Sequence, residues 1–346
     1  MGDNNQMIKR VFIAVLILGF LIVSIFVFHF YSVFFASNTA FETPQQEVLI
    51  PSTDTKIAAY DTLVRVVEHF DFFQQAALSK GYQPIPGRFV LDKGMNNNEL
   101  INRLRSENKP IRLTFNNQKT LMHLAAYVAK KIETDSTAIM QAFYNVDFLK
   151  ENGLTQDNVL SICLPNSYDV FWNTTAEQFR DRMLRQYKAF WTPRREAARK
   201  KIKLSRVEVH ILASIVQREA NILSEQKQIA TVYLNRLKKR MRLQSCPTVI
   251  YAHDLLETDY NSEIRILLYD HLKLKSPFNT YRNKGLPPGP IFMPEIATID
   301  AVLFPATHNY YYFIVDPNRA GYHKYSTTFK THLKNKDRLK TYIKNH

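Results

Sequence analysis

A glutamate stands in the stretch SIVQREANILSEQ, residues 214–226, where the apolar pattern predicts the buried face of a helix. Leu212, Ile215 and Val216 precede Glu219 by seven, four and three residues, and these offsets share one helical face. Because burial disfavours a charged carboxylate, we expect the pKa of Glu219 to lie above the ordinary value of about 4.3. A glutamate that stays protonated near neutral pH can donate a proton to a leaving oxygen as a general acid.

The helix that carries Glu219 has a clear predicted start. Ser205 is followed three residues later by Glu208, and this S-x-x-E spacing is a capping box. The predicted helix continues through Leu212 and Val216 and has Glu219 in its interior. A structural role is the alternative, since a glutamate on such a face can also pair with a basic residue from elsewhere in the fold.

Other reactive residue types form weaker patterns. Cys163 and Cys246 could form a disulfide in an oxidising compartment, although two unpaired thiols are the favoured interpretation. Cys246 with His253 or His271 would suit a cysteine peptidase, but nearness in sequence is poor evidence for a catalytic pair. No two histidines have helical ligand spacing together with a glutamate, so the motif of a zinc protease is absent. The sequence implies no other metal and no nucleotide or organic cofactor.

The rest of the chain predicts the elements that position Glu219. Residues 45–115 contain Gly and Pro turns, a strand at 88–91, a helix from about 97 and a strand near 111–115, which indicates a small α/β module. A largely helical region follows, and later two strands, YYYFIV and HKYS, are joined by the turn DPNRAG. The fold class is therefore α+β, and the predicted domains are 1–40, 41–115, 116–204 and 205–346.

The N-terminal domain predicts a membrane anchor. No charge occurs from Val11 to Phe28, and at about 1.5 Å per residue the apolar run can cross a hydrocarbon core of about 30 Å. A cleaved signal peptide is the alternative, but its apolar region is usually only about 7–15 residues long. Lys9 and Arg10 precede the run and Glu42 follows it, so we expect a cytoplasmic N-terminus and a chain that is outside the membrane after about residue 40.

The partner that the formal net charge of +15 favours depends on the side of the membrane on which the chain lies. In a cytoplasmic protein it would favour nucleic acid as a partner. Outside the membrane we expect no nucleic acid, and lipid head groups or the carboxylates of cell-wall peptides become the anionic partners. Basic runs at 185–206 and 236–242 are most simply solvated surfaces.

Three stretches resemble, in order and spacing, the catalytic region of the endolytic murein transglycosylases, the YceG-like or MltG family. They are LASIVQREANILSEQKQIATVYLNRLKKRMRLQSCPTVIYA, SPFNTYRNKGLPPGPI and YYYFIVDPNRAGYHKYSTTF, within about residues 205–332, and LPNSYDVFWNTTAEQF is similar to the segment that precedes them in the family. The resemblance implies an N-terminal transmembrane helix, a small LysM-like α/β module and a larger mixed catalytic domain. Residues 116–204 would then be the helical connecting part of the YceG-like region.

The activity that this resemblance implies is cleavage of peptidoglycan. The β-1,4 bond between N-acetylmuramic acid and N-acetylglucosamine would be cut within a strand to leave a 1,6-anhydro end, with Glu219 as general acid and then base. The muramic acid's own 6-hydroxyl would be the nucleophile, so one carboxyl group suffices. The family usually has two glutamates flanking one residue here, but this chain has Gln217 in the first place, and Cys246 stands where the family is usually acidic.

The resemblance also implies substrate-binding positions, partners and a location. The predicted substrate-binding residues are Glu225, Asn235, Gln244, Thr248, Tyr251, Ser276, Asn279, Thr280 and Tyr281. Turn and capping roles are their alternative. The expected partners are peptidoglycan strands, the cell's inner membrane, crossed once, and peptidoglycan synthases. A catalytically inactive scaffold that binds the wall is the alternative function.

Overall fold

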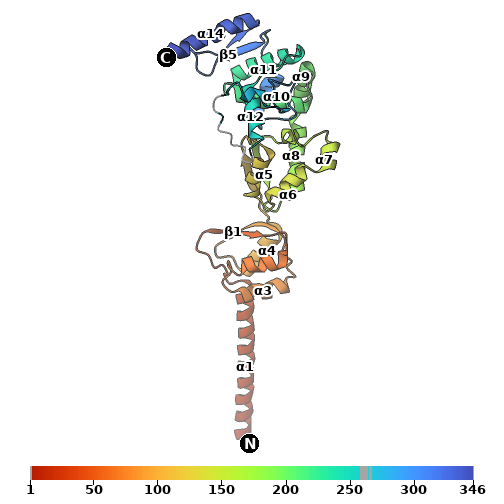
Figure 1. Cartoon of the computed structure of the whole chain (residues 1–346). Coiled ribbons are helices and arrows are strands. Elements are labelled where there is room, and N and C mark those ends of the chain that lie inside the picture. Colours follow the sequence, from red (N-terminus) through yellow and green to blue (C-terminus); the bar gives the residue numbers. More distant parts are fainter. Residues whose placement is uncertain (1, 258–263, 265–266, 346) are drawn as a thin grey trace. The chain divides into compact units, whose positions relative to one another are not determined.

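The computed structural model describes residues 2–257, 264 and 267–345, and its elements fall into two units (Figure 1). Unit 1 comprises Met1–Arg112 and Asp169–Thr174, and unit 2 comprises Leu113–Tyr168 and Thr175–His346. The architecture mixes helices with three two-stranded sheets among the described residues, which confirms the expected α+β class.

Unit 1 begins with the long helix α1 (Gly2–Phe34). Its segment Gln6–Phe34 is long and apolar enough to cross a membrane, as the uncharged run predicts. The apolar side chains between Val11 and Phe28 are exposed, so the protein itself does not bury them.

The rest of unit 1 is the small α/β module. β1 (Gln45–Ile50) pairs antiparallel with β2 (Gly87–Asp92), and the helices α2 (Thr55–Leu63), α3 (Phe70–Ser79) and α4 (Asn97–Ser106) accompany them. Alternate side chains of β2 are buried, as expected for a strand with one face on a core. The strand and helix predicted between residues 88 and 106 are thus confirmed, while the LysM-like assignment stays a prediction.

A buried amide joins the end of α1 to this module. Val33 is 4% exposed and belongs to the core of unit 1. Asn97, at the start of α4, donates a 2.7 Å hydrogen bond to the Val33 carbonyl and accepts one of 2.7 Å from Asn38. Helix α1 is therefore attached through its last turn and not only through the chain that follows.

Replacing Asn97 by alanine should lower the free energy of unfolding of unit 1 by about 1–3 kcal/mol, because the Val33 carbonyl and the Asn38 amide lose a buried partner. The measurement is thermal unfolding of the full chain in detergent. Asn102, on an exposed part of the same helix, supplies the control Asn102→Ala. Equal destabilisation by the two variants would contradict a special role for Asn97.

Unit 2 carries most of the helices. Its helices are α5 (Leu121–Ala129), α6 (Ser136–Phe143), α7 (Val146–Glu151), η1 (Val159–Ile162), α8 (Ala176–Phe190), α9 (Pro193–Ile202), α10 (Arg206–Glu219), α11 (Leu223–Lys238), α12 (Cys246–Asp254), η2 (His271–Lys273), α13 (Ile296–Leu303) and α14 (Phe329–Asn345), and its strands are β5 (Tyr312–Val315) and β6 (His323–Ser326). Strands β3 (Ile111–Phe115) and β4 (Asn166–Val170) each have residues in both units. β3 pairs with β4, and β5 pairs antiparallel with β6 as predicted from the late strand motifs.

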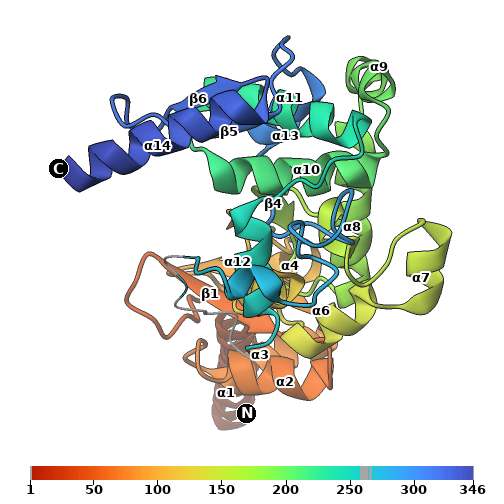
Figure 2. The ribbon, with the colours of Figure 1, turned by 45° about the horizontal axis from the view of Figure 1, so that its top comes forward.

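The core of unit 2 lies where α10, α11 and α13 pack together (Figure 2). α10 brings Leu212, Ile215 and Val216 to this core, and all three are fully buried. These are the residues whose spacing indicates an apolar face, so the predicted burial is confirmed.

The predicted start of α10 is confirmed, but its predicted end is wrong. Ser205 and Glu208 form the reciprocal capping box. Glu219, expected in the interior of the helix, is its last residue, because Ala220 takes an extended conformation with φ −149° and ψ 144°. The chain turns there so that α11 can pack back on α10, and this leaves the Glu219 side chain at a helix end.

Candidate active site

Glu219 meets two hydroxyl groups from elements that follow it. Tyr233 lies on α11, and its hydroxyl donates a hydrogen bond of 2.7 Å to Glu219 Oε1. Ser245 immediately precedes α12, and its Oγ donates a hydrogen bond of 2.6 Å to the same oxygen. Glu219 Oε2 accepts no hydrogen bond from the part of the chain that the structure describes. One carboxyl oxygen is thus held, and the other is free.

Burial raises the pKa of Glu219 above its ordinary value, which is the direction predicted from the sequence. The hydrogen bonds from Ser245 and Tyr233 oppose this rise because they stabilise the carboxylate, and the positive charge of Arg236 acts in the same sense. Within residues 2–257, 264 and 267–345, no basic side chain forms an ion pair with Glu219, so the structural alternative of a salt bridge is not observed.

Glu219 lines a cavity of about 330 Å³. The other lining residues are Arg236, Leu243, Gln244, Cys246, Tyr281, Tyr312, Phe313, Phe329, His332 and Lys336. The wall contains both aromatic rings and polar groups, and Glu219 is the one acidic residue among the described residues that line it. Phe329, His332 and Lys336 come from α14, so the C-terminal helix completes the cavity.

Arg236 brings a buried positive charge to this cavity. It is 6% exposed, and its guanidinium donates to the carbonyls of Tyr311 at 2.6 Å and Leu243 at 2.7 Å. The guanidinium also lies 5.2 Å from the ring centre of Tyr312. Since carbonyl oxygens satisfy its donors without neutralising its charge, Arg236 remains able to stabilise the carboxylate form of Glu219.

Two of the predicted substrate-binding residues support Ser245 instead of lining the cavity. Thr248 and Thr280 are buried, and their hydroxyl oxygens lie 2.8 Å apart. The Thr248 hydroxyl donates to the Ser245 carbonyl at 2.7 Å, and the Thr280 hydroxyl accepts from the Ser245 amide at 3.0 Å. Together they fix the backbone whose side chain holds Glu219.

Glu225 and Asn235 hold the segment that contains β5 and β6. Both lie on α11, with Glu225 in the predicted first turn. Glu225 Oε2 accepts from the His323 amide at 2.9 Å and from the Tyr325 hydroxyl at 2.7 Å. The Asn235 side-chain amide donates to the His308 carbonyl at 3.0 Å. Neither residue lines the Glu219 cavity.

Three further predicted residues also lie outside that cavity. Asn279 is buried and its side-chain amide donates to the carbonyls of η2 and the residue after it, which are Leu272 at 3.0 Å and Leu274 at 2.8 Å. Ser276 Oγ accepts from a backbone amide of its own turn at 3.2 Å. Tyr251 lines a separate cavity of about 200 Å³.

Gln244 and Tyr281 are the two predicted binding residues that line the Glu219 cavity. Gln244 has a left-handed backbone with φ 53°, a conformation that costs about 1–3 kcal/mol for a residue other than glycine. The Tyr281 hydroxyl lies 3.3 Å from Cys246 Sγ. Local strain beside a reactive group is common at functional sites, so Gln244 is well placed to contact a ligand.

The two departures from the family pattern have separate surroundings. The side chain of Gln217 accepts a 2.6 Å hydrogen bond from the amide of Glu295, the residue that precedes α13.

Cys246 is exposed and Cys163 is buried, and both thiols are free. Full burial raises the pKa of the Cys163 thiol, and partial desolvation of its sulfur raises that of Cys246 although the residue is exposed. Both shifts disfavour the thiolate that a cysteine peptidase requires. His253 and His271 contact each other, with ring centres 5.1 Å apart.

The arrangement suits proton transfer by a single carboxyl group. The free oxygen of Glu219 can donate a proton, while Tyr233 and Ser245 keep the other oxygen in place and stabilise the carboxylate that results. Among the described residues no group of three or more His, Cys, Asp or Glu could hold a metal ion. The Glu219 carboxyl group and its two hydroxyl partners are the groups that this site offers for acid–base chemistry.

Sequence reasoning missed Tyr233, Ser245 and Arg236. A buried tyrosine usually needs a partner for its hydroxyl, and Tyr233 lies among apolar residues of a predicted helix, so its burial was foreseeable. Its partner was not, because Glu219 is fourteen residues earlier on another helix. The local sequence does not predict that α14 lines the cavity, because α14 lies more than a hundred residues after Glu219.

Comparisons with known proteins match most of the chain. A model of the YceG-like family matches residues 48–338. An endolytic murein transglycosylase of Bacillus subtilis (strain 168) is 27% identical over 307 residues, which cover 83% of this chain and 81% of that protein. One of Streptococcus pneumoniae serotype 2 is 29% identical over 196 residues, 55% of this chain and 35% of that protein. The crystal structure of a yceG-like protein of Listeria monocytogenes shares the fold, with a TM-score of 0.55 and 24% identity over 85% of this chain and 99% of that one.

Proposed function

The chain belongs to the YceG-like family, and from this premise we propose that it is an endolytic lytic transglycosylase of peptidoglycan. It cleaves the β-1,4 bond between N-acetylmuramic acid and N-acetylglucosamine within a strand and leaves a 1,6-anhydro end. The observation that carries the mechanism is the hydrogen bonding of Glu219, whose Oε1 accepts two hydrogen bonds while Oε2 accepts none from the described residues. Glu219 is also the one acidic side chain among the described residues that line its cavity.

In the first step Glu219 acts as a general acid. Its protonated Oε2 gives the proton to the glycosidic oxygen, and the bond between that oxygen and C1 of muramic acid breaks. The leaving sugar departs with a new hydroxyl group, and positive charge develops at C1. The carboxylate that remains is stabilised by Tyr233, Ser245 and Arg236.

In the second step the same carboxylate is the base. The 6-hydroxyl of the muramic acid attacks C1, a new O6–C1 bond forms, and the hydroxyl proton moves to Glu219. The proton donated in the first step is thereby recovered, and no water is consumed. An intramolecular nucleophile of this kind gains from proximity, which reduces the need for a second carboxylate.

The remaining predicted positions take two kinds of role in this proposal. Gln244 and Tyr281 contact the glycan, since both line the cavity. Thr248 and Thr280 position Ser245, and Glu225 and Asn235 position the segment with β5 and β6. Ser276, Asn279 and Tyr251 shape the segment around residues 272–281 and its packing against α12.

The anchor proposal rests on α1. Its apolar length spans the cell's inner membrane once, and Lys9 with Arg10 keeps the N-terminus in the cytoplasm. The chain after about residue 40 then lies on the side where peptidoglycan is made, with residues 41–115 as a LysM-like module, 116–204 as the connecting part and 205–346 as the catalytic region. Peptidoglycan synthases are the partners that this location suggests.

The test is mass spectrometry of the products that the full chain in detergent releases from uncrosslinked peptidoglycan strands. Internal cleavage that yields 1,6-anhydro ends supports the proposal. Products with reducing ends would instead indicate hydrolysis and a second group that activates water. Binding of strands without cleavage would favour the inactive scaffold.

Cleavage should decline as the pH rises through the pKa of Glu219, because the first step needs the protonated acid. Burial raises that pKa, so the decline should come at a higher pH than for an exposed glutamate, whose pKa is about 4.3. The measurement is kcat/KM between about pH 4 and pH 9. A rate that increases steadily with pH over this range would contradict the assignment of Glu219 as the acid.

A further inference from the structure

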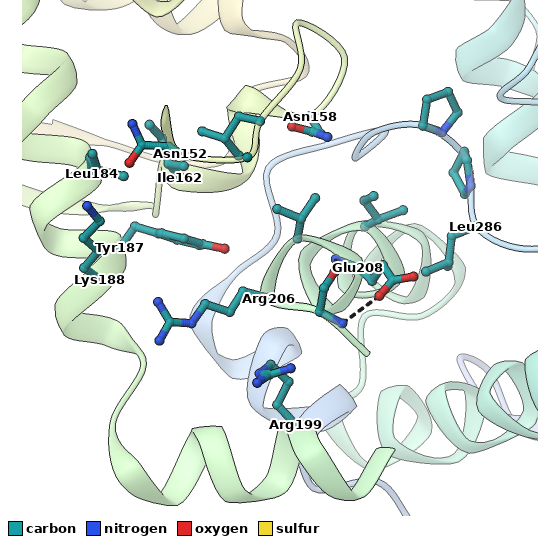
Figure 3. Close-up of a pocket in the computed structure, with 17 residues that line it drawn as sticks. Asn152, Asn158, Ile162, Leu184, Tyr187, Lys188, Arg199, Arg206, Glu208 and Leu286 are labelled. Atoms are coloured by element: carbon teal, nitrogen blue, oxygen red, sulfur yellow. Dashed lines mark hydrogen bonds between the residues drawn. The ribbon is translucent and has the colours of Figure 1, made fainter. Parts of the chain in front are cut away.

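A second cavity of unit 2, to which the proposed reaction assigns no role, lies at the other end of α10. This cavity of about 670 Å³ is lined by residues 152–154, 158 and 162, by α8, by Arg199 of α9, by the start of α10 and by residues 286–288 (Figure 3). It shares no described lining residue with the Glu219 cavity. α10 runs from Arg206 to Glu219, so at about 1.5 Å per residue its two ends are about 20 Å apart.

Tyr187 places an unused hydrogen-bonding group in this cavity. The residue is 6% exposed. Its hydroxyl lies near the indole N–H of Trp191, which can only donate, so among the described residues the hydroxyl proton has no acceptor. Figure 3 shows the hydroxyl directed into the space between α8 and the start of α10. A buried polar group without a partner costs about 1–3 kcal/mol, so its presence here points to a ligand that supplies an acceptor.

The charge around Tyr187 favours an anion. Lys188, Arg199 and Arg206 line the cavity, and Glu208 is the one carboxylate among the described lining residues. Glu208 already accepts a 2.6 Å hydrogen bond from the Ser205 amide. Lys188 is exposed and forms no ion pair within the described ranges.

The positive charges of Arg199 and Arg206 are partly neutralised by Glu196, which does not line the cavity. Glu196 accepts from Arg199 at 2.9 Å and from Arg206 Nε at 2.6 Å. The two terminal nitrogens of Arg206 make no hydrogen bond with other described residues, so they remain available. Lys188 forms no ion pair with the described residues, and the start of α10 adds a partial positive charge. The net charge around the cavity is therefore positive.

The remaining wall is apolar. Leu154, Ile162, Leu184, Ile211 and the segment Leu286–Pro288 face the same space. A simple inorganic anion would leave these surfaces in contact with water. A ligand that has small apolar groups and ends in a carboxylate matches both parts of the wall.

We propose that this cavity binds the carboxylate end of a peptide carried by the peptidoglycan strand. The Tyr187 hydroxyl donates to the carboxylate, Lys188 and Arg206 supply its counter-charge, and the apolar wall contacts the peptide's methyl groups. This inference rests on the proposed function for its choice of peptide. It makes the cavity a second substrate site that recognises strands by their peptides, while the glycan bond is cut at Glu219.

The test measures binding of the free stem peptide, prepared by removing it from peptidoglycan, to the full chain in detergent by isothermal titration calorimetry. Tyr187→Phe removes only the hydroxyl and keeps the ring contacts with Trp191 and His210. We expect this variant and Lys188→Gln each to raise Kd about tenfold. Lys200→Gln makes the same charge change on an exposed part of α9 that does not line the cavity, and it should change Kd by less than about twofold.

A peptide with its C-terminal carboxylate amidated should bind about tenfold more weakly than the acid. Equal binding of acid and amide, unchanged Kd in both cavity variants, or no saturable binding below about 1 mM would overturn the proposal. Because this assay needs no cleavage, it is independent of Glu219 chemistry, and Glu219→Gln should bind the peptide as the native chain does. Formation of 1,6-anhydro ends without peptide binding would reject this site and leave the proposed function standing.

Discussion

Replacing Glu219 by glutamine should reduce strand cleavage by about 10²- to 10⁴-fold, the usual contribution of a general acid. Glutamine has the same shape, and its carbonyl oxygen can still accept the hydrogen bonds from Tyr233 and Ser245. It cannot give a proton to the glycosidic oxygen or take one back from the 6-hydroxyl. The measurement is the rate of formation of 1,6-anhydro ends from uncrosslinked strands, with the variant at the same concentration as the native chain.

Stability separates this loss from a loss of fold. A buried carboxyl group with a raised pKa binds its proton more tightly when folded, so the native free energy of unfolding falls as the pH rises through that pKa. Glu219→Gln should therefore unfold at the same or a higher temperature than the native chain above this range. Glu151→Gln, on an exposed part of α7, is the matched control for cleavage. Retained cleavage in Glu219→Gln would reject Glu219 as the acid.

Replacing Tyr233 by phenylalanine should lower kcat by about 10- to 100-fold, which corresponds to losing a hydrogen bond to a charged group. The Tyr233 hydroxyl stabilises the carboxylate form of Glu219, through a hydrogen bond of 2.7 Å. Without it the pKa of Glu219 should rise further, so the decline of cleavage at high pH should shift to still higher pH. The measurement is the pH profile of kcat and of kcat/KM.

The control for Tyr233 is another buried tyrosine. Tyr168 is 4% exposed and its hydroxyl donates a 2.7 Å hydrogen bond to a backbone carbonyl away from Glu219. Tyr168→Phe should destabilise the fold to a similar degree but leave the pH profile unchanged. Phenylalanine at 233 keeps the edge contact with Phe313, whose ring centre lies 5.8 Å away. If Tyr233→Phe lowers stability without moving the pH profile, Tyr233 has only a structural role.

The raised pKa also gives a physical reason why such a site is costly to keep. An isolated buried carboxylate is unfavourable, and hydroxyl donors can only partly replace the water that it loses. The hydrogen bonds from Tyr233 and Ser245 stabilise the carboxylate form of Glu219 relative to the protonated form, and so they limit the rise of its pKa. The balance leaves an acid that can both lose and regain a proton during one turnover.

Local patterns in the sequence were enough to predict much of the fold. The capping box at Ser205 and Glu208, the apolar face of α10 and the late strand pair involve residues a few positions apart, and all three occur as predicted. The uncharged run of α1 is long enough to cross a membrane for the same reason, since length and composition alone decide it. Glu219 drew attention because a carboxyl group on an apolar face departs from that periodicity, and the resemblance to the YceG-like family then favoured its role as an acid over a structural role.

Tertiary packing decided what surrounds Glu219. Periodicity shows that a face is buried but not what it packs against, so it could not reveal that α11 brings Tyr233 and the start of α12 brings Ser245 to one carboxyl oxygen. Nor could it reveal that α10 ends at Glu219, because that end depends on the return of α11 across the same core. The glutamate and the direction of its pKa shift could be predicted from the local sequence, whereas its hydroxyl partners and its cavity depend on contacts between distant parts of the chain.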